Sequence, residues 1–475
     1  MARRVAPALA VDELRAWQIK TFRERSSCNP SKLTSVAATA RATAQLFFSD
    51  LTLHRNICIV FPSTDARSSV PMTHHYSDQR IPGNRLLHSP GPTHVPEAVQ
   101  NALRRQPMDL GDPRLDETIA ACEAGLKRLL GTREADVFLY AANGHGAWEA
   151  TVANLLDTGQ KVLIAGTGHF SESWAIQTEA MGVEVLRTPY VEGYTIDMAA
   201  VEAVLRADTG HEIVALFVVH TDTASGTTNE LAGFRGMLDE LGHPALYVVD
   251  VVATLGAVAF DMDALGANVV VGASQKGLMC PPGLGFCAVD AKAFALSERN
   301  SAPRFYWDWR KRKSELAYRK FCGTPPQTML FGLEAALGLI FLEGVDAVFA
   351  RHRTLANATQ AAVAAWSEGG AMQFLCKIPE ARSVSVTSVL VSPAINTDEL
   401  RHIAREQFQV AIAGGLGPFA GRMFRIGHLG DLNPAMLLGC LAGVEGALTV
   451  MGVPIGREGL HRAVEVLARA ATPTV

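Results

Sequence analysis

The segment Val269-Val270-Val271-Gly272-Ala273-Ser274-Gln275-Lys276-Gly277-Leu278 places a lysine among small residues, directly after a short β-branched run. Runs of this kind are typical of strands buried in a parallel sheet. Lysine side chains normally lie on solvated surfaces. A partly buried lysine holds its proton less tightly and can act as an amine nucleophile. The segment therefore indicates an α/β sheet with a reactive lysine at one end.

Further apolar runs of the same character precede this one. They are Val137–Ala141, Val162–Ala165, Val183–Leu186, Ile213–Val219 and Ala245–Val249. Helical patterns lie between the runs, such as the apolar stripe Leu115, Ile119, Cys122, Leu126 and Leu129. This alternation predicts buried parallel strands in a three-layer αβα domain with a mainly parallel sheet. Ligands bind such sheets at the carboxyl ends of the strands.

The pattern changes after residue 343. We expect a long helix at 345–367, a strand within the alternating segment 383–392, a basic helix at 398–407 and a strand at 409–413. Together these elements predict a smaller C-terminal α+β domain. The expected division is therefore an N-terminal arm at 72–93, a large domain at 94–343 and a small domain at 344–475.

Residues 1–71 differ from the rest of the chain. All 41 glycines lie at or after Gly83, and residues 1–71 carry ten basic and five acidic residues, against 33 and 42 in the remainder. Three interpretations compete: a targeting segment, a regulatory arm, or an upstream extension of a protein whose translation begins at Met72. We favour the start at Met72, because a polar stretch there leads directly into the first motif.

Composition excludes several classes of protein. A net charge of −4 over 475 residues gives no electrostatic footprint for nucleic acid. No apolar run approaches the roughly 18–20 residues that a membrane span needs. The eight cysteines include no CxxC pair. They are expected to be reduced thiols of a cytoplasmic protein, forming neither a disulfide frame nor a metal site.

Small and polar residues follow the predicted strands. Asn143-Gly144-His145 stands at a strand-to-helix turn, where exposed backbone N–H groups suit a phosphate. Phe170, after the next run, could stack on a planar cofactor or belong to the core. The polar stretch 220–227 indicates a pocket wall, although His220 by itself is best interpreted as a satisfied core histidine.

A carboxylate and a lysine end two of the buried runs. Asp250 directly follows its run, where an unpaired carboxylate is costly. Lys276 follows 26 residues later, about one strand–helix–strand step. A pyridoxal phosphate site needs a lysine for a covalent bond and an acid for the pyridine nitrogen. With the phosphate turn and the aromatic ring, these residues predict such a site.

From about Leu86 to the C-terminus the chain resembles the class V aminotransferases of pyridoxal phosphate fold type I, most of all the serine–glyoxylate and alanine–glyoxylate group. The resemblance is carried by Ser89-Pro90-Gly91-Pro92, Asn143-Gly144-His145-Gly146, Asp250-Val251-Val252, Ser274-Gln275-Lys276-Gly277-Leu278, Pro281-Pro282-Gly283-Leu284-Gly285, Gly414-Gly415-Leu416-Gly417 and Arg425-Ile426-Gly427-His428-Leu429-Gly430. Several motifs in the right order make chance an improbable explanation.

The resemblance implies a role for each matching residue. Lys276 would hold the cofactor covalently and move protons as the catalytic residue, and Arg425 would clamp the substrate α-carboxylate. The implied cofactor-binding residues are Asn143, Gly144, His145, Phe170, Thr223, Asp250, Val252, Gln275 and Thr324. Among these, Asp250 would pair with the pyridine nitrogen and Phe170 would stack on the ring.

The resemblance also implies a homodimer with shared active sites, in which Thr324 reaches the partner subunit's phosphate. This chain departs from the family at two places. Phe321 replaces a tyrosine that many members carry, which removes a hydrogen-bond donor. The segment Leu110-Gly111-Asp112-Pro113-Arg114 replaces a basic or aromatic residue near the substrate, which leaves the amino donor open.

The implied function is transamination from a small L-amino acid, serine by preference, to glyoxylate, giving glycine and hydroxypyruvate. Alanine or aspartate as donor, or pyruvate as acceptor, is the near alternative. A lyase or desulfurase of the same fold is a rival, but Cys376 and Cys440 lie in apolar surroundings typical of core thiols. A non-catalytic homologue is a further rival, against which the presence of both Lys276 and Arg425 argues.

Overall fold

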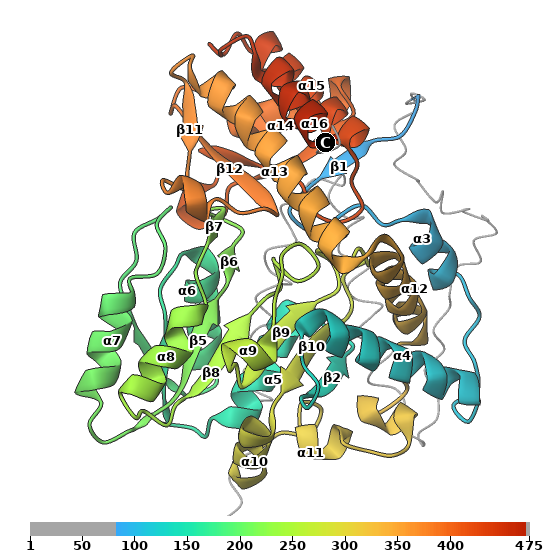
Figure 1. Cartoon of the computed structure of the whole chain (residues 1–475), viewed down its shortest axis with the longest axis vertical. Coiled ribbons are helices and arrows are strands. Elements are labelled where there is room, and N and C mark those ends of the chain that lie inside the picture. The colour runs from blue at the N-terminus through green and yellow to red at the C-terminus, as the bar shows by residue number, and fades with distance from the viewer. Residues whose placement is uncertain (1–81, 472–475) are drawn as a thin grey trace, which may run out of the picture. The chain divides into compact units, whose positions relative to one another are not determined.

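Seven strands form the larger sheet in the computed structural model, which describes residues 82–471 (Figure 1). Across the sheet their order is β2 (Asp136–Tyr140), β10 (Gly285–Val289), β9 (Val269–Ala273), β8 (Leu246–Asp250), β5 (Ile213–Val219), β3 (Lys161–Ile164) and β4 (Glu184–Arg187). The six predicted runs all appear and point in one direction. The interpretations of residues 1–71 and of Met72 concern residues outside the described part.

Two features of this sheet differ from the prediction. β10 was not predicted, and it is antiparallel to both of its neighbours, β2 and β9. Its residues directly follow the Pro281–Gly285 motif, so the sequence pattern merged them with a loop. The run at 183–186 was predicted to be buried, but β4 is one of the two edge strands, and its end residues Glu184 and Arg187 are exposed. An edge strand has only one neighbour to cover it.

Helices cover both faces of the large sheet. Along β5, Leu216 and Val218 face one helix layer, and Phe217 and Val219 face the other, as the alternation of a strand requires. The first layer contains α4 (Pro113–Leu130), α7 (Met198–Ala207), α8 (Ala232–Glu240), α9 (Met262–Leu265) and α12 (Gln327–Glu343). The second layer contains α5 (Gly144–Leu155), α6 (His169–Ala180), α10 (Ala291–Arg299) and α11 (Trp309–Arg312). The predicted three-layer αβα architecture is confirmed, and the predicted apolar stripe is the buried face of α4.

A second sheet of five strands has its own hydrophobic core. Its order is β1 (Leu86–His88), β13 (Val410–Gly414), β14 (Met423–Gly427), β12 (Val386–Val391) and β11 (Met372–Phe374). The helices that pack with it are α13 (Val345–Ser367), α14 (Thr397–Gln407), α15 (Pro434–Val450) and α16 (Gly459–Ala471), orange to red in Figure 1. The predicted long helix, basic helix and two strands correspond to α13, α14, β12 and β13.

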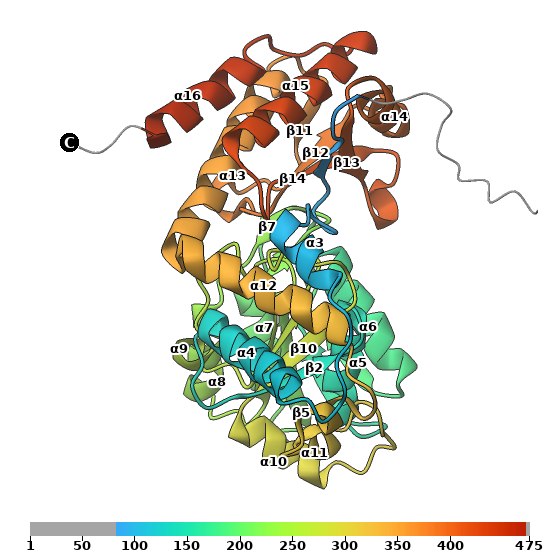
Figure 2. The same ribbon diagram turned by 90° about the vertical axis from the view of Figure 1, so that its right-hand side faces the viewer.

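The first described strand belongs to this second sheet although it precedes the large sheet in the chain. Leu86 of β1 pairs in parallel with Val410 of β13. The chain then returns through α3 (Glu97–Leu103), which packs on α12, as α4 also does (Figure 2). Residues 89–96 therefore cross between the two sheets.

The remaining short elements are the hairpin β6 (Thr221–Asp222) and β7 (Thr227–Thr228), and the 3₁₀ turns η3 (Ala317–Phe321), η4 (Pro379–Ala381) and η5 (Gly417–Phe419). Within residues 82–471 no single helix is long and apolar enough to cross a membrane. The helices α12 and α13 reach the necessary length and apolar composition only when taken together, and the pair is bent by 87°.

Candidate active site

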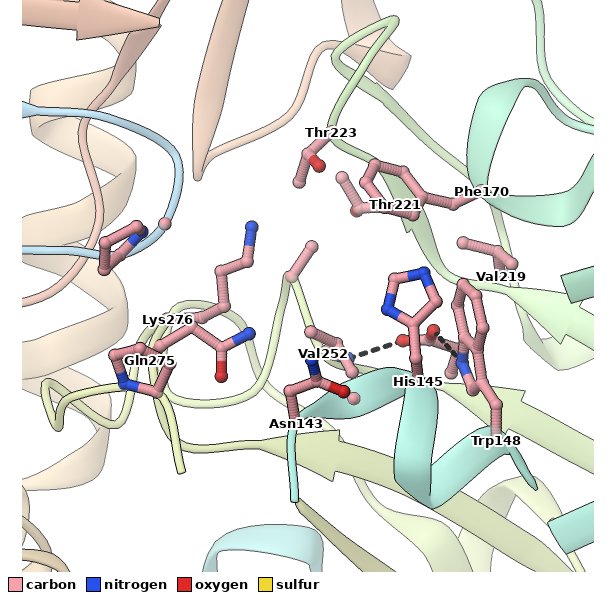
Figure 3. A pocket seen from close by; sticks show the side chains of 16 residues that line it. Asn143, His145, Trp148, Phe170, Val219, Thr221, Thr223, Val252, Gln275 and Lys276 are labelled. Carbon is pink, nitrogen blue, oxygen red and sulfur yellow. Dashed lines mark hydrogen bonds between the residues drawn. The ribbon is translucent and has the colours of Figure 1, made fainter. Parts of the chain in front are cut away.

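A cavity of about 320 Å³ opens at the carboxyl ends of the central strands (Figure 3). Its wall is built from the N-termini of α5 and α6, from the residues after β5, β8 and β9, and from the crossing segment. The lining residues are Gly91, Pro92, Asn143, Gly144, His145, Trp148, Phe170, Val219, Thr221, Thr223, Asp250, Val252, Ala253, Gln275, Lys276 and Pro282. Eight of the nine residues predicted to bind a cofactor, and the predicted catalytic lysine, line this one cavity.

Lys276 reaches into the cavity opposite Phe170, His145 and Trp148 (Figure 3). Its Nζ donates a hydrogen bond to the carbonyl of Pro90 in the crossing segment. Burial lowers the pKa of Lys276 to about 8, with a further lowering from Arg425, while Asp250 and Asp222 oppose the shift. The amine is therefore partly unprotonated close to neutral pH, which a nucleophile requires.

Asp250 lies at the end of β8 and is almost completely buried. Its Oδ1 accepts a hydrogen bond from the backbone N–H of Val252 at 2.6 Å, and its Oδ2 accepts one from Trp148 Nε1 at 2.7 Å. Burial raises the pKa of Asp250 to about 6, and these two donors and Lys276 limit the rise. A cationic ligand group beside this carboxyl is expected to hold it in the charged form.

The turn at the start of α5 presents backbone N–H groups to the cavity. Asn143 caps the helix, because its Oδ1 accepts from the Gly146 N–H at 3.3 Å. A Cβ on Gly144 would lie 3.3 Å from Val252 Cγ2, so a small residue keeps this turn close to the neighbouring loop. Burial, together with His169 nearby, lowers the pKa of His145 and favours its neutral imidazole. The turn is suited to an anionic group.

Gln275 and Thr223 stand on opposite sides of Lys276 (Figure 3). The Oε1 of Gln275 is buried and has no hydrogen-bond partner within residues 82–471. A buried polar atom without a partner is costly, so this amide is prepared for a ligand. Thr223 is buried in the turn between β6 and β7.

Arg425 lies on β14 of the second sheet and does not line the cavity itself. Its Nε donates to the Gly414 carbonyl at 2.7 Å and its Nη1 to the Thr223 carbonyl at 2.8 Å. Burial lowers its pKa to about 10, and its charge acts on Lys276. The bond to Thr223 attaches the second sheet to the wall of the cavity.

Asp222 is a functional candidate that sequence reasoning missed. It is fully buried, and it accepts backbone hydrogen bonds from Phe170 at 2.8 Å, Ala224 at 2.7 Å and Ser225 at 3.0 Å. Burial raises its pKa, and these N–H groups oppose the rise. The signal was available: like Asp250, it is a carboxylate close after a fully apolar strand. It was interpreted only as one of several polar residues in the stretch 220–227.

Four other residues named in the sequence analysis have definite places. Thr324 is exposed between η3 and α12 and does not line the cavity, whereas Phe321 is buried in the core of the large sheet. His220 is a satisfied core histidine as expected, because its Nδ1 and Thr254 Oγ1 are hydrogen-bonded at 3.0 Å. Cys440 is a core thiol whose pKa burial raises strongly.

Comparison with known proteins adds independent findings. The family model for class V aminotransferases matches residues 86–420. The chain is 37% identical over 381 residues to the serine–glyoxylate aminotransferase of Methylorubrum extorquens, covering 79% of this chain and 94% of that one. It is 37% identical over 369 residues to the L-aspartate–glyoxylate aminotransferase of Paracoccus denitrificans, covering 77% and 91%. The structure of pyridoxamine–pyruvate aminotransferase from Mesorhizobium loti matches with a TM-score of 0.75 and 25% identity over 83% of this chain and 100% of that one.

Proposed function

The chain belongs to the class V aminotransferase family and is a transaminase, and from this premise we propose that it transfers the amino group of serine to glyoxylate. The products are hydroxypyruvate and glycine. The observation that carries the proposal is the Lys276 amine facing the buried Asp250 carboxyl across one cavity. Serine is named as donor because a relative of that activity aligns over 94% of its length.

The family works with pyridoxal phosphate, and the cavity residues fit that cofactor. The unpartnered amide of Gln275 can turn its NH₂ group toward a phosphate, and the α5 turn at Asn143, Gly144 and His145 adds backbone donors. Asp250 would pair with the ring nitrogen. Phe170 and Val252 would contact the ring, Thr223 would lie near the ring oxygen, and Lys276 would hold the cofactor covalently. The bound cofactor supplies an electron sink for the substrate α-carbon.

The protein's own residues then carry the proton and orient the substrate. Lys276 Nζ would serve as the general base that takes up the proton from the substrate α-carbon and as the general acid that later returns it. Its lowered pKa keeps part of the population in the basic form. Arg425 orients the α-carboxylate through the N–H groups that Gly414 and Thr223 leave free. With glyoxylate as acceptor, the same lysine and arginine would serve the return half of the reaction.

We further propose that the working form is a homodimer with shared active sites. Thr324 is exposed in the single chain, away from the cavity. An exposed hydroxyl next to a proline-rich turn suits a residue that serves the phosphate in the partner subunit. Sedimentation of the purified protein, with and without Thr324→Ala, tests the dimer separately from the contribution of the hydroxyl.

Aspartate is the second candidate donor, because a relative named for that donor is equally similar in sequence. The experiment is a donor panel with glyoxylate as acceptor, in which glycine formation is measured for serine, alanine and aspartate. We expect serine to give a kcat/KM at least tenfold above the other two. Aspartate in first place would replace the proposed donor, and sulfide release from cysteine would favour the desulfurase rival.

The visible spectrum of the purified protein provides the accompanying control. We expect an absorbance band from lysine-bound cofactor that changes on addition of serine, and Lys276→Ala to abolish both the band and turnover. A Lys276→Ala variant that retained both would overturn the assignment of this lysine.

A further inference from the structure

Trp148 lines this cavity, but neither the motifs nor the family resemblance gave it a role. It lies in the second turn of α5 and is 2% exposed. Its indole Nε1 donates to Asp250 Oδ2 at 2.7 Å, drawn as a dashed line in Figure 3. The second dashed line there is the bond from the Val252 N–H to Asp250 Oδ1. Each oxygen of the buried carboxyl is therefore held by one N–H group.

The indole of Trp148 is itself fixed by aromatic packing. It stacks on Trp174 with ring centroids 5.2 Å apart and an angle of 9° between the planes. Trp174 in turn stacks on Phe217 of β5, with centroids 4.4 Å apart. The His145 ring lies 4.6 Å from Trp148 on the cavity side. Rotating the indole away from Asp250 would break this column, so the direction of its N–H is built into the core.

The hydrogen bond has an electrostatic consequence. Burial favours the neutral form of Asp250, and the Trp148 and Val252 N–H groups favour the charged form. Only the charged form can stabilise a protonated nitrogen beside it. Removing the indole N–H while keeping the ring should make Asp250 easier to protonate and leave Oδ2 free to turn.

We propose that Trp148 is a positioning residue of the transaminase, which through its indole N–H keeps Asp250 ionised and aimed at the cofactor's ring nitrogen. The inference rests on the proposed binding of pyridoxal phosphate. The inferred role belongs to the hydrogen bond and not to the bulk of the side chain. A substitution that keeps an aromatic ring but removes the N–H can therefore test the hydrogen bond alone.

The chain offers a matched pair of variants for this test. Trp148→Phe removes the donor to Asp250 and keeps an aromatic ring in the column. Trp174→Phe makes the same change one layer deeper, at an indole whose Nε1 has no hydrogen-bond partner within residues 82–471. If packing alone matters, the two variants should behave alike.

The first measurement is the equilibrium dissociation constant for added pyridoxal phosphate, by dialysis of the full-length protein. We expect Trp148→Phe to weaken binding at least tenfold and Trp174→Phe to stay within twofold of the wild type. We also expect the pH at which the bound-cofactor absorbance changes to move in Trp148→Phe alone. Equal effects of the two variants, or no effect of Trp148→Phe, would overturn the proposal.

The second measurement does not depend on the cofactor. The chain has six tryptophans, so ¹⁵N-indole labelling gives few signals, and loss of one in Trp148→Phe assigns it. We expect the Trp148 signal to move with pH as Asp250 titrates, and to stop moving in Asp250→Asn. A signal indifferent to both changes would overturn this inference, whereas a wild-type protein that takes up no pyridoxal phosphate would overturn the proposed function instead.

Discussion

The carboxylate of Asp222 accepts the backbone N–H of Phe170 at 2.8 Å, and so joins the first turn of α6 to the hairpin that follows β5. The other carboxylate oxygen accepts the N–H groups of Ala224 and Ser225 in the turn that carries Thr223. The buried Asp222 carboxylate therefore holds in place both the backbone of Phe170 and the turn that carries the Thr223 hydroxyl. It also stands near both cations of the site, since its charge raises the pKa of Lys276 and of Arg425.

Asp222→Asn is expected to reduce kcat/KM at least tenfold. An amide has one acceptor oxygen, so its NH₂ group must face either the Phe170 N–H or the turn, and an anion near Lys276 is lost. Because Asp222 raises the lysine pKa, the Lys276 amine of the cofactor-free protein should lose its proton at a lower pH in the variant. The pH dependence of the rate of pyridoxal phosphate uptake measures this titration. Glu192→Gln removes a partly buried carboxylate near Asp222, whose charge raises the pKa of Glu192, and should leave that titration unchanged. A variant that titrates like the wild type would contradict the charge argument.

Arg425→Lys is expected to raise the KM for the amino donor at least tenfold with little change in cofactor affinity. A lysine cannot reproduce the planar fork that binds Gly414 and Thr223 and still presents further N–H groups. Steady-state kinetics and dialysis separate the two effects. Arg401→Lys is the matched control, because Arg401 also lies beside Gly414 but donates to the Ile412 carbonyl. Comparable losses in both variants would assign the effect to the strand rather than to substrate binding.

Gly91→Ala is expected to abolish cofactor uptake while the protein still folds. Gly91 has a φ of +125°, and a Cβ there would lie 2.5 Å from Lys276 Cδ and Cε. The methyl group must therefore displace the lysine side chain. Gly83→Ala places a methyl group at a φ of +77° with nothing within 4 Å, and so controls for backbone strain alone. Dialysis against pyridoxal phosphate and far-UV circular dichroism make the comparison, and normal uptake by Gly91→Ala would refute the expected clash.

Acid sensitivity is expected from the three buried histidines His88, His352 and His428. Burial lowers the pKa of His88 and His352 to about 4 and that of His428 to about 3. His352 Nε2 accepts the Gly430 N–H at 2.9 Å, a bond that protonation would break. The unfolded chain binds these protons near pH 6.5 and the folded chain only near pH 4. The free energy of unfolding should therefore be highest above pH 6.5 and fall toward pH 4, by up to about 1.4 kcal/mol per pH unit for each group.

Urea unfolding between pH 7.5 and 4.5 measures this dependence. His352→Gln keeps an acceptor for the Gly430 N–H and removes the titration, so the slope should decrease by about one proton. His461→Gln alters an exposed ring and should leave the slope unchanged. If the free energy of unfolding falls equally steeply with pH in the wild type and in His352→Gln, other groups control the loss of stability in acid.

The local sequence pattern predicted most of the fold, because each helix or strand has a recognisable pattern of apolar residues within a short segment. The β-branched run before Lys276 and the apolar stripe of α4 are both burial patterns with a short period. The exposure of β4 depends on the order of strands, which no single run contains. β10 was missed because it begins at Gly285, the last residue of the proline- and glycine-rich motif at 281–285, and so did not stand out as a separate apolar run.

The sequence predicted correctly that Lys276 and Asp250 meet at one cavity, because each is an ionisable residue directly after a buried strand. Trp148 was missed because its importance depends on a hydrogen bond to Asp250, which lies 102 positions away in the sequence. The Arg425 bond to the Thr223 carbonyl spans 202 positions. Thr324 differs again, since the proposed role in a partner subunit would leave no trace in the geometry of one chain.

The carbonyl that accepts the hydrogen bond of Lys276 belongs to Pro90, two residues after His88 ends the strand β1. Two residues of chain span at most about 7 Å. β1 is fixed to β13, whose carbonyl at Gly414 also receives the Arg425 guanidinium. The smaller sheet is therefore linked to both residues, to Lys276 through Pro90 and to Arg425 through Gly414. Any tilt of that sheet must alter the surroundings of the Lys276 amine and of the Arg425 guanidinium together.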